Sequence, residues 1–423
     1  MDKNIKNAIQ KWSVPIKSSD DLNPLIDRMA QSKIVLLGEA SHGTSEFYTI
    51  RTEITKKLIK EKGFSFIAVE GDWPSCQEVN SYIKGFSKTY RNTEEIIISA
   101  FHRWPSWMWA NREVSSLVEW LKDFNRNNKS DKKIGFYGLD VYSLWESMDE
   151  ILNYLKKINS SDLETAKKAF SCFEPFNRNN ETYAISAGYL SDDCTDEVVD
   201  LLTSIRSNTK TSNLDPEEAL NLEVNALVAA NAEEYYRSMV QSDSRSWNVR
   251  DKHMVEALNA IRKYYGEDAK VIIWEHNTHV GDARATDMQR EGMLNVGQIV
   301  REQHKKEDVF IAGFGTHKGT VIASEAWGAE QKIMDVPPAK AFSWEDYLFQ
   351  AGSFDKWLLF TDENRSYFSN ILGHRAIGVV YQPEMEHYGN YVPSNLSARY
   401  DAFIYVDTSK ALHPLQNYPN NYE

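Results

Sequence analysis

The chain has 423 residues, of which 42% are hydrophobic and 26% charged, and its formal net charge is −13. This balance is typical of a folded globular protein and excludes an intrinsically disordered chain. The negative charge argues against nucleic acids and anionic membranes as partners, because both require a basic surface. No apolar run approaches a membrane span, and the first residues show no apolar segment typical of a secretory signal.

The stretch from Ile34 to Pro74 has the order strand, turn, helix, strand. The apolar residues 34–37 predict a short strand covered on both faces, and the sequence Gly38-Glu39-Ala40-Ser41-His42-Gly43 predicts a turn. Apolar residues at helical spacing then predict a helix that ends at Gly63. Residues 64–69 predict a second strand, which completes a parallel β-α-β unit.

Polar side chains stand at the ends of both strands of this unit. Glu39 and His42 lie in the turn after the first strand, and Glu70 closes the second. Because a right-handed crossover brings the carboxyl ends of parallel strands to one sheet edge, we expect these three side chains to lie close together. In open α/β sheets that edge is where ligands bind.

After the second strand the pattern predicts a loop, an aromatic segment, a helix and a third strand. The loop is the polar stretch 85–93, and the segment Phe101–Asn111 contains three tryptophans around a proline. Core packing and a pocket wall are equally good interpretations of this aromatic segment. A helix around residues 114–121 follows, and then a strand at 133–139 that ends on Asp140.

Residues 144–266 contain no convincing strand and are predicted to form a helical insertion that covers part of the sheet edge. Asp215-Pro216-Glu217-Glu218 predicts a helix start, with a capping aspartate, a proline at the first helical position and acids in the first turn. We therefore divide the chain into a first part of the α/β core at 1–143, the helical insertion or subdomain at 144–266, and a second part of the core at 267–423.

Strands resume after the insertion at four apolar runs, namely residues 270–274, 309–315, 376–381 and 402–406. The first of these runs ends in Glu275 and His276, and the second ends in Thr316 and His317. Strands and helices on both sides of the insertion predict an α/β fold with a central, mainly parallel sheet sandwiched by helices.

The three cysteines are Cys76, Cys172 and Cys194. They lack the spacing of a metal site and are not expected to form a disulfide framework. We therefore expect a protein of the reducing cytoplasm.

The predicted strand ends share a polar pattern, which comprises Glu39, Glu70, Asp140, Glu275 with His276, and Thr316 with His317. A buried carboxylate costs desolvation free energy unless it is paired, so several of them at one sheet edge favour a functional site. Structural pairing with arginines is the alternative explanation.

Three uses of this polar cluster are open. In the first, His42 is a general base that takes a proton from water, while Glu39 or Glu70 orients it and Arg51 pairs with a carboxylate or stabilises an oxyanion. In the second, a metal ion is held by a set of four ligands whose spacing is compatible but not diagnostic, namely Glu39, His42, His276 and His279. In the third, these residues are satisfied core polar groups without chemistry.

Motifs absent from the sequence narrow the chemistry. It contains no Gly-x-Ser-x-Gly nucleophile elbow, no His-Glu-x-x-His and no Walker A loop. The segment Gly313–Gly319 is close to a dinucleotide-binding loop, but it has one residue too many before its last glycine and comes late in the chain. These absences argue against an ordinary serine hydrolase and favour water that is activated directly by a base.

Several segments spread along the chain together resemble a known family: Gly38–Gly43, Arg51, Val69–Gly71, His276–Arg284, Gly373–Tyr381, Gly389–Pro393 and Arg399–Phe403. The combination resembles the erythromycin esterase family, some members of which are named succinoglycan biosynthesis proteins. The resemblance covers almost the whole chain and is far more specific than any one motif. It implies an α/β protein with a central sheet and a helical insertion.

The resemblance also implies hydrolysis of a carboxylic ester, which is the macrolide lactone in the members that give the family its name. It implies that His42 activates water, surrounded by Glu39, Glu70, Arg51, His276 and His279. Glu275 departs from the small residue common at this position in the antibiotic-inactivating members, so the substrate is not fixed by the resemblance.

The sequence thus predicts an esterase-type hydrolase that acts on a small-molecule ester or lactone without a cofactor. The candidate catalytic residues are His42, Glu39, Glu70, Arg51, His276 and His279. The candidate substrate-binding residues are Asp140, Arg250, Lys318, Trp107 and Arg103. The alternatives are a metal-dependent hydrolase that uses the same cluster and a non-catalytic small-molecule binding protein of the same fold.

Overall fold

The computed structural model describes residues 3–128, 132–190, 193–209 and 214–415. Within these residues the main sheet has nine strands, in the order β1-β8-β11-β6-β2-β5-β3-β4 with β7 paired to β6. Their bounds are β1 Val14–Pro15, β2 Ile34–Leu37, β3 Phe64–Asp72, β4 Gly135–Asp140, β5 Lys270–Trp274, β6 Val309–Ser324, β7 Gln331–Val336, β8 Lys356–Leu359 and β11 Ala402–Ser409.

The strands from β11 to β4 in this order all run parallel to their neighbours. The strands β1, β7 and β8 pair in antiparallel fashion. A separate antiparallel pair is formed by β9 Ile371–Arg375 and β10 Tyr391–Asn395. The predicted central and mainly parallel sheet is therefore confirmed.

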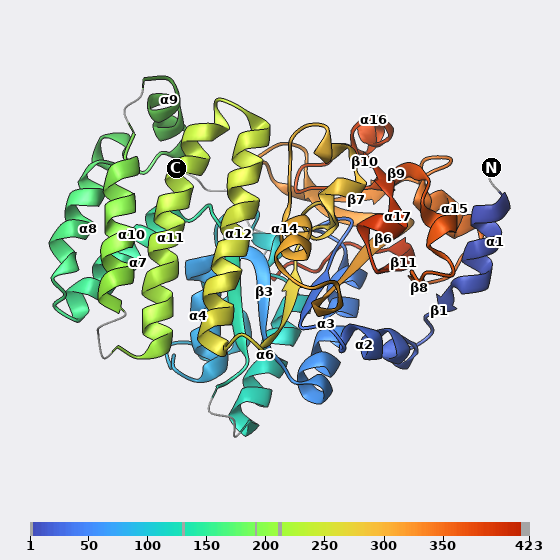
Figure 1. Cartoon of the computed structure of the whole chain (residues 1–423), viewed down its shortest axis with the longest axis horizontal. Coiled ribbons are helices and arrows are strands. Elements are labelled where there is room, and N and C mark those ends of the chain that lie inside the picture. The colour runs from blue at the N-terminus through green and yellow to red at the C-terminus, as the bar shows by residue number, and fades with distance from the viewer. Residues whose placement is uncertain (1–2, 129–131, 191–192, 210–213, 416–423) are drawn as a thin grey trace.

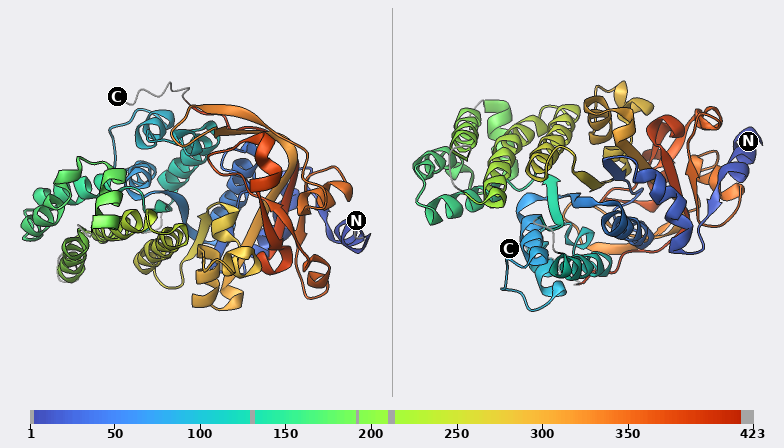
Figure 2. Two further views of the ribbon diagram at one scale, coloured as in Figure 1. Left: turned by 90° about the horizontal axis from the view of Figure 1, so that it is seen from above. Right: turned by 60° about the horizontal axis from the view of Figure 1, so that its bottom comes forward.

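Helices cover both faces of the sheet (Figures 1 and 2). Outside the segment 144–265 they are α1 Lys3–Trp12, α2 Asn23–Met29, α3 Ser45–Lys62, α4 Trp73–Lys84, α5 Thr93–Ala100, α6 Arg112–Asn127, α13 Asn277–Val280, α14 Val296–Gln303, α15 Trp344–Gln350, α16 Glu386–Gly389 and α17 Leu396–Arg399. Val35 and Leu37 of β2 join a hydrophobic cluster with α3 and α6. Ile34 and Leu36 point to the other face and join a cluster with α14. This alternation is what a strand buried on both faces requires.

The β2-α3-β3 unit matches its sequence prediction closely. The strand β2 has the predicted bounds, and α3 ends at Gly63. Gly63 has a φ of 74°, a left-handed conformation that glycine adopts without steric cost and that stops the helix. The unit therefore places the turn after β2 and the end of β3 at the same sheet edge.

The described residues of the segment 144–265 form helices joined by turns and irregular loops, and they contain no strand. The segment contains α7 Leu144–Lys157, α8 Asp162–Ser171, α9 Asn180–Leu190, α10 Thr195–Thr209, α11 Pro216–Met239 and α12 Asp243–Tyr265. Asp215 caps α11 as predicted, since its side chain accepts the N–H groups of Glu217 and Glu218. The helices α7–α11 share a hydrophobic cluster and lie together at one end of the molecule (Figures 1 and 2). No helix of the described ranges is long and apolar enough to cross a bilayer.

Two strand predictions in the last third of the chain need correction. The strand β6 does not end at Gly315 but continues to Ser324, because it pairs with β11 as far as Gly319 and with β7 beyond it. The apolar run 376–381 is not a strand and makes only isolated bridges, and its Ile377 and Tyr381 instead pack in a small hydrophobic cluster with β6 and β7. Hydrophobicity alone did not show which partner each run would find.

The cysteine prediction is also wrong, because Cys172 and Cys194 form a disulfide. Cys172 follows α8 and Cys194 precedes α10, and their Cα atoms are 5.9 Å apart. The packing of α8 against α10 brings the two thiols together, which their spacing in the sequence did not indicate. Cys76 is a free, buried thiol.

Candidate active site

The turn after β2 is held in place by close contacts with the ends of β5 and β6. The backbone N–H of Asn277 donates to the carbonyl oxygen of Glu39 at 2.9 Å. A Cβ atom on Gly38 would lie 2.1 Å from Oδ1 of Asn277, and one on Gly43 would lie 1.9 Å from the carbonyl oxygen of Ile322. Both positions therefore exclude a side chain, and the turn is fixed relative to its neighbours.

His42 lies in this turn with its imidazole bound to Glu39. Nδ1 of His42 is 2.9 Å from Oε1 of Glu39, and Nη2 of Arg51 donates to Oε2 of the same carboxylate at 2.5 Å. A carboxylate only accepts, so the proton of the neutral imidazole sits on Nδ1 and its Nε2 has a free lone pair. Within the described residues Nε2 makes no hydrogen bond, and the side chain is 9% exposed.

The charges around His42 favour its protonated form. Burial alone would lower its pKa, but the charge of Glu70 and the hydrogen bond with Glu39 more than offset burial and raise the pKa above 6.5. The surroundings of the imidazole therefore stabilise the proton that it would accept.

Glu70, at the end of β3, ties together the groups that surround His42. Its Oε2 accepts the backbone N–H of His276 at 2.8 Å, and its Oε1 accepts Nη2 of Arg250 at 2.8 Å. Arg250 also donates to both oxygens of Asp140, at 2.9 and 2.7 Å. Burial acts to raise the pKa of Glu70, but the neighbouring imidazoles and Arg250 hold that pKa well below its ordinary value. Glu70 is therefore ionised.

His276 faces His42, and the ring centroids are 4.8 Å apart. Its Nδ1 lies 2.8 Å from Oγ1 of Thr278 and accepts the Thr278 backbone N–H at 3.3 Å, which leaves the ring proton on Nε2. Nε2 is buried and has no partner in the described part of the chain. Burial and the charge of His42 lower the pKa of His276 well below 6.5, so it is a neutral N–H donor.

His279 is enclosed by its neighbours. Its Nδ1 lies 3.0 Å from each oxygen of Asp251, and Nη1 of Arg250 is 2.9 Å from its Nε2. The indole ring of Trp247 stacks on the imidazole at 4.6 Å with an interplanar angle of 5°. Both ring nitrogens of His279 thus have partners, whereas in His42 and His276 only Nδ1 has a hydrogen-bond partner among the described residues.

Glu275 directly follows β5 and is fully buried. Neither of its carboxyl oxygens has a hydrogen-bond partner among the described residues. Burial, followed by the charges of Glu70 and Asp251, raises the pKa of Glu275 well above 4.5. Its surroundings therefore favour the protonated form of this group.

The structure brings most of the predicted site residues into one connected cluster, which we call the His42 cluster: Glu39, His42, Arg51, Glu70, Asp140, Arg250, His276 and His279. Arg103 lies beside it, with Nη1 donating to the Tyr142 carbonyl and Nη2 paired with Asp72. Trp107 is buried in the hydrophobic core.

Lys318 does not join the His42 cluster. Its side chain is exposed and has no contact with the cluster among the described residues. The prediction assumed that the strand ends at Gly315, whereas β6 continues to Ser324 and Lys318 therefore does not stand at a strand end.

Sequence reasoning missed three side chains that hold the cluster, namely Tyr48, Trp247 and Asp251. Tyr48 precedes Arg51 by three positions on α3, and the Arg51 guanidinium carbon lies 4.5 Å from its ring centroid. Helical spacing was therefore a usable signal for Tyr48. Trp247 and Asp251 contact His279 from α12, and no pattern in the sequence links that helix to the turn after β5.

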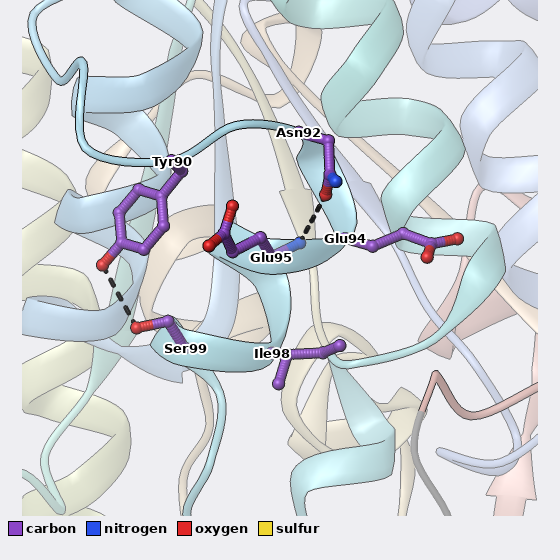
Figure 3. Close-up of a pocket in the computed structure, with 6 residues that line it drawn as sticks. All are labelled: Tyr90, Asn92, Glu94, Glu95, Ile98 and Ser99. Carbon is purple, nitrogen blue, oxygen red and sulfur yellow. Dashed lines mark hydrogen bonds between the residues drawn. The ribbon is translucent and has the colours of Figure 1, made fainter.

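Two hollows on the molecular surface lie elsewhere, and no residue of the His42 cluster lines either of them. One is lined by the residues drawn in Figure 3, namely Tyr90, Asn92, Glu94, Glu95, Ile98 and Ser99. Several of its polar groups bind one another, since the Tyr90 hydroxyl lies 3.1 Å from Oγ of Ser99 and Asn92 accepts the N–H of Glu95. The other is formed by residues between 282 and 290 and between 371 and 398.

The donor atoms around His42 do not fit a metal ion. Within the residues that the structure describes, no group of three or more His, Cys, Asp or Glu side chains is arranged to hold one. Both oxygens of Glu39 are bonded to other side chains, and the neighbouring guanidinium groups of Arg51 and Arg250 would repel a cation. No catalytic step is therefore assigned to a metal at the predicted ligands Glu39, His42, His276 and His279.

The fold and the His42 cluster define an α/β protein with a glutamate–histidine pair at the carboxyl edge of a parallel sheet. The sequence profile of the family described as erythromycin esterase matches residues 59–409, which is most of the chain. The chain therefore belongs to the erythromycin esterase family, and the resemblance seen in the sequence is confirmed. Family membership places it among esterase-like hydrolases.

The named relatives are distant in sequence. The Bacillus subtilis (strain 168) protein named "Putative hydrolase YbfO" is 21% identical over 423 residues, which cover 94% of this chain and 90% of that protein. Erythromycin esterase type II of Escherichia coli is 23% identical over 306 residues, which cover 67% and 68%. The crystal structure of a succinoglycan biosynthesis protein matches with a TM-score of 0.79 and 19% identity, over 97% of this chain and 98% of that one. This structural likeness bears on the fold alone.

Proposed function

We propose that the protein hydrolyses a carboxylic ester or lactone by direct attack of a water molecule from which His42 takes a proton. One observation carries this proposal. Nδ1 of His42 is bound to Glu39, whereas Nε2 has no partner in the described residues and the ring faces that of His276. An imidazole oriented by a carboxylate in this way is an effective general base.

In the first step Nε2 of His42 takes a proton from water while the water oxygen bonds to the ester carbonyl carbon. The carbonyl π electrons move to oxygen, which becomes an oxyanion. In the second step the oxyanion re-forms the carbonyl, the carbon–alkoxy bond breaks, and His42 returns its proton to the leaving alkoxide. The products are one carboxylic acid and one alcohol, or a single hydroxy acid from a lactone.

His276 is proposed as the donor to the oxyanion. Its proton sits on Nε2, because Nδ1 accepts from Thr278. Nε2 is buried and makes no hydrogen bond of good geometry to the described residues, although the backbone of Ala40 lies near the ring. A neutral N–H group held in a desolvated site can donate a hydrogen bond to the oxyanion and so stabilise its developing negative charge. Its low pKa keeps it in this form even beside a protonated His42.

Two carboxylates would stabilise the imidazolium that forms on His42. Glu39 accepts its Nδ1–H and fixes the ring, while Arg51 fixes Glu39. Glu70 is ionised and its charge favours the protonated ring. Arg250 would hold Glu70 in position, because Nη2 of Arg250 donates directly to the Glu70 carboxylate.

The substrate in this proposal is a neutral small-molecule ester or lactone of open identity. Arg103 and Asp140 remain candidates for contacts with it, since Arg103 lies beside the cluster and its side chain is 36% exposed. Trp107 is less suited to this role because it is buried in the hydrophobic core.

The test is a panel of p-nitrophenyl esters of increasing acyl length together with lactones of increasing ring size, macrolides included. We expect turnover of at least one class and no acyl-protein adduct in acid-quenched samples analysed by intact mass. Ser41→Ala is the matched control for a hidden serine nucleophile in the same turn, and it should retain activity. A stoichiometric acyl adduct would contradict direct water attack.

Two further outcomes would replace the proposal. A tight ligand found by thermal shift, with no turnover of any ester, would indicate a binding protein. Loss of activity after dialysis against a chelator, with stoichiometric metal in the untreated protein, would indicate a metal-dependent hydrolase.

A further inference from the structure

Arg51 is the most deeply buried cation of the His42 cluster, with 1% of its surface exposed. Its Nη2 donates to Oε2 of Glu39 at 2.5 Å, and the other oxygen of that carboxylate contacts His42. Arg51 therefore contacts the proposed base only indirectly, through the carboxylate of Glu39. Its guanidinium is shielded from solvent, so its neighbours decide where it points.

Two aromatic rings enclose this guanidinium. Its central carbon lies 4.5 Å from the ring centroid of Tyr48 and 4.5 Å from that of Trp274. Aromatic faces attract a cation. The Tyr48 hydroxyl also lies close enough to the guanidinium for Arg51 to act to lower the pKa of that hydroxyl, against the larger effect of burial, which raises it. The two rings therefore stabilise the charge of Arg51 and restrict the orientation of its guanidinium beside Glu39.

The two rings are themselves fixed. Tyr48 lies one helical turn before Arg51 on α3, and Trp274 is the last residue of β5. Nε1 of Trp274 donates to Oγ1 of Thr55, one turn beyond Arg51 on the same helix, at 3.1 Å. Tyr48 packs edge-on against Trp274 and Trp109, with centroid distances of 6.3 and 6.2 Å. This aromatic slot joins helix α3, strand β5 and the tryptophan segment.

We propose that Tyr48 and Trp274 are positioning residues for His42, which act by holding Arg51 against Glu39. The two rings orient Arg51, Arg51 orients Glu39, and Glu39 orients the imidazole of His42. Loss of the Tyr48 ring frees the guanidinium to turn, and Glu39 then loses the partner that fixes its second oxygen. The imidazole keeps its place in the turn but loses its fixed orientation. This inference rests on the proposed function of His42 as the base.

Three variants separate the ring of Tyr48 from its hydroxyl and from general packing. Tyr48→Phe keeps the ring, and Tyr48→Leu removes it. Tyr82→Leu is the matched control, because Tyr82 is a buried tyrosine of the same hydrophobic cluster whose ring meets Lys122. Circular dichroism verifies folding, and Tyr48→Met replaces Tyr48→Leu if the latter gives no folded protein.

The decisive measurement is NMR of protein labelled with ¹⁵N-histidine, and it needs no substrate. His42, His279 and His374 each have Nδ1 bound to a buried carboxylate, so each is expected to give a low-field Nδ1–H signal protected from exchange. His42→Gln and His374→Gln identify the signals of these two histidines, and the remaining one belongs to His279. Tyr48→Leu should broaden or remove the His42 signal and leave that of His374, whereas Tyr48→Phe and Tyr82→Leu should leave both.

Kinetics supply the second readout. Tyr48→Leu should lower kcat by at least tenfold with KM within twofold, and Tyr48→Phe should stay within threefold of the parent protein. An intact His42 signal in folded Tyr48→Leu would overturn the proposal. A lost signal with unchanged kcat would instead leave the positioning role standing and overturn the role of His42 as the base.

Discussion

Among the described residues, two buried histidines hydrogen-bond a glutamate through Nδ1, and these two glutamate–histidine pairs differ at the second ring nitrogen. His42 contacts Glu39 and His374 contacts Glu345, in both cases through Nδ1, at 2.9 and 2.5 Å. Nε2 of His374 lies 3.2 Å from the hydroxyl of Tyr400, whereas Nε2 of His42 has no partner among the described residues. Nε2 of His42 therefore keeps a free lone pair, whereas both ring nitrogens of His374 contact neighbouring side chains.

The charges around the two pairs differ in the same sense. Burial opposes the protonated form of both imidazoles. Around His42 the charge of Glu70 and the bond with Glu39 overcome burial and raise the pKa. Around His374 burial prevails over Glu345 and lowers the pKa, with nearby arginine charges acting in the same direction. A carboxylate–histidine pair alone therefore does not mark a catalytic base. The free nitrogen and the second carboxylate distinguish the pair at His42.

The largest expected difference between the two pairs comes from replacing each imidazole. His42→Gln should lower kcat for ester hydrolysis by about 100-fold or more, because the general base is lost. His374→Gln is the matched control and should retain activity within a few-fold at temperatures where it is folded. Steady-state kinetics at neutral pH check both. A folded His374→Gln variant that loses as much activity would show that the buried pair takes part in catalysis.

The next largest effect is expected when the carboxylate of each pair is replaced. In the proposed mechanism hydrolysis requires neutral His42, so activity should fall as the pH decreases through the His42 pKa, which lies above 6.5. Glu39→Gln removes a charge that raises this pKa, so the acid limb of the pH–rate profile should move to lower pH. We also expect kcat to fall roughly 10- to 100-fold, because a neutral amide stabilises the imidazolium less.

The control for Glu39→Gln is Glu345→Gln. It removes the corresponding carboxylate of the second pair and should leave the acid limb where it is, because Glu345 contacts His374 and not His42. The measurement is kcat/KM between pH 5 and 9 for each variant. An acid limb that moves equally in both variants would mean that it reports general stability rather than His42.

Local patterns were enough to predict the central part of the site. Glu39, His42 and Glu70 follow directly from two strand ends and a right-handed crossover, and the structure brings them together. Arg51 follows from helical spacing. The contrast between the two pairs was not predictable, because it depends on whether Tyr400 reaches Nε2 of one imidazole, which is a tertiary contact.

The failed predictions have the same physical origin. The run 376–381 is apolar enough for a strand, but it packs against β6 and β7 instead of joining a ladder. The continuation of β6 through Lys318 depends on its pairing with β7. The Cys172–Cys194 disulfide depends on the packing of α8 against α10. Each outcome was decided by a partner that is distant in the sequence.

A smaller effect is expected at Glu275, a buried carboxyl group without any histidine partner. Its pKa in the folded state lies well above 4.5, so above pH 4.5 the unfolded chain loses the proton first. The folded state then binds more protons, and the free energy of unfolding falls as the pH rises. Glu275→Gln removes this cost, and its melting temperature relative to the parent protein should rise by roughly 1–3 °C per pH unit from pH 5 upwards, until the pH reaches the folded-state pKa of Glu275.

Differential scanning calorimetry across this pH range provides the check for Glu275. Glu61→Gln is the control, because Glu61 is an exposed glutamate of α3, and its difference from the parent protein should be flat with pH. A flat difference for Glu275→Gln as well would mean that this carboxyl group is ionised in the folded protein and has found a partner.

The smallest effect is expected outside both pairs, at Lys318. Its side chain is exposed on β6, and no contact joins it to the His42 cluster within the described part of the chain. Lys318→Ala should therefore change kcat/KM by less than about twofold, as is usual for an exposed charge far from the reacting atoms. Arg250→Gln is the reference for a cation inside the cluster and should reduce kcat/KM much more, because Arg250 bridges Glu70 and Asp140. A large rise in KM for Lys318→Ala with kcat unchanged would instead mean that the substrate extends along β6 and that Lys318 binds its distal part.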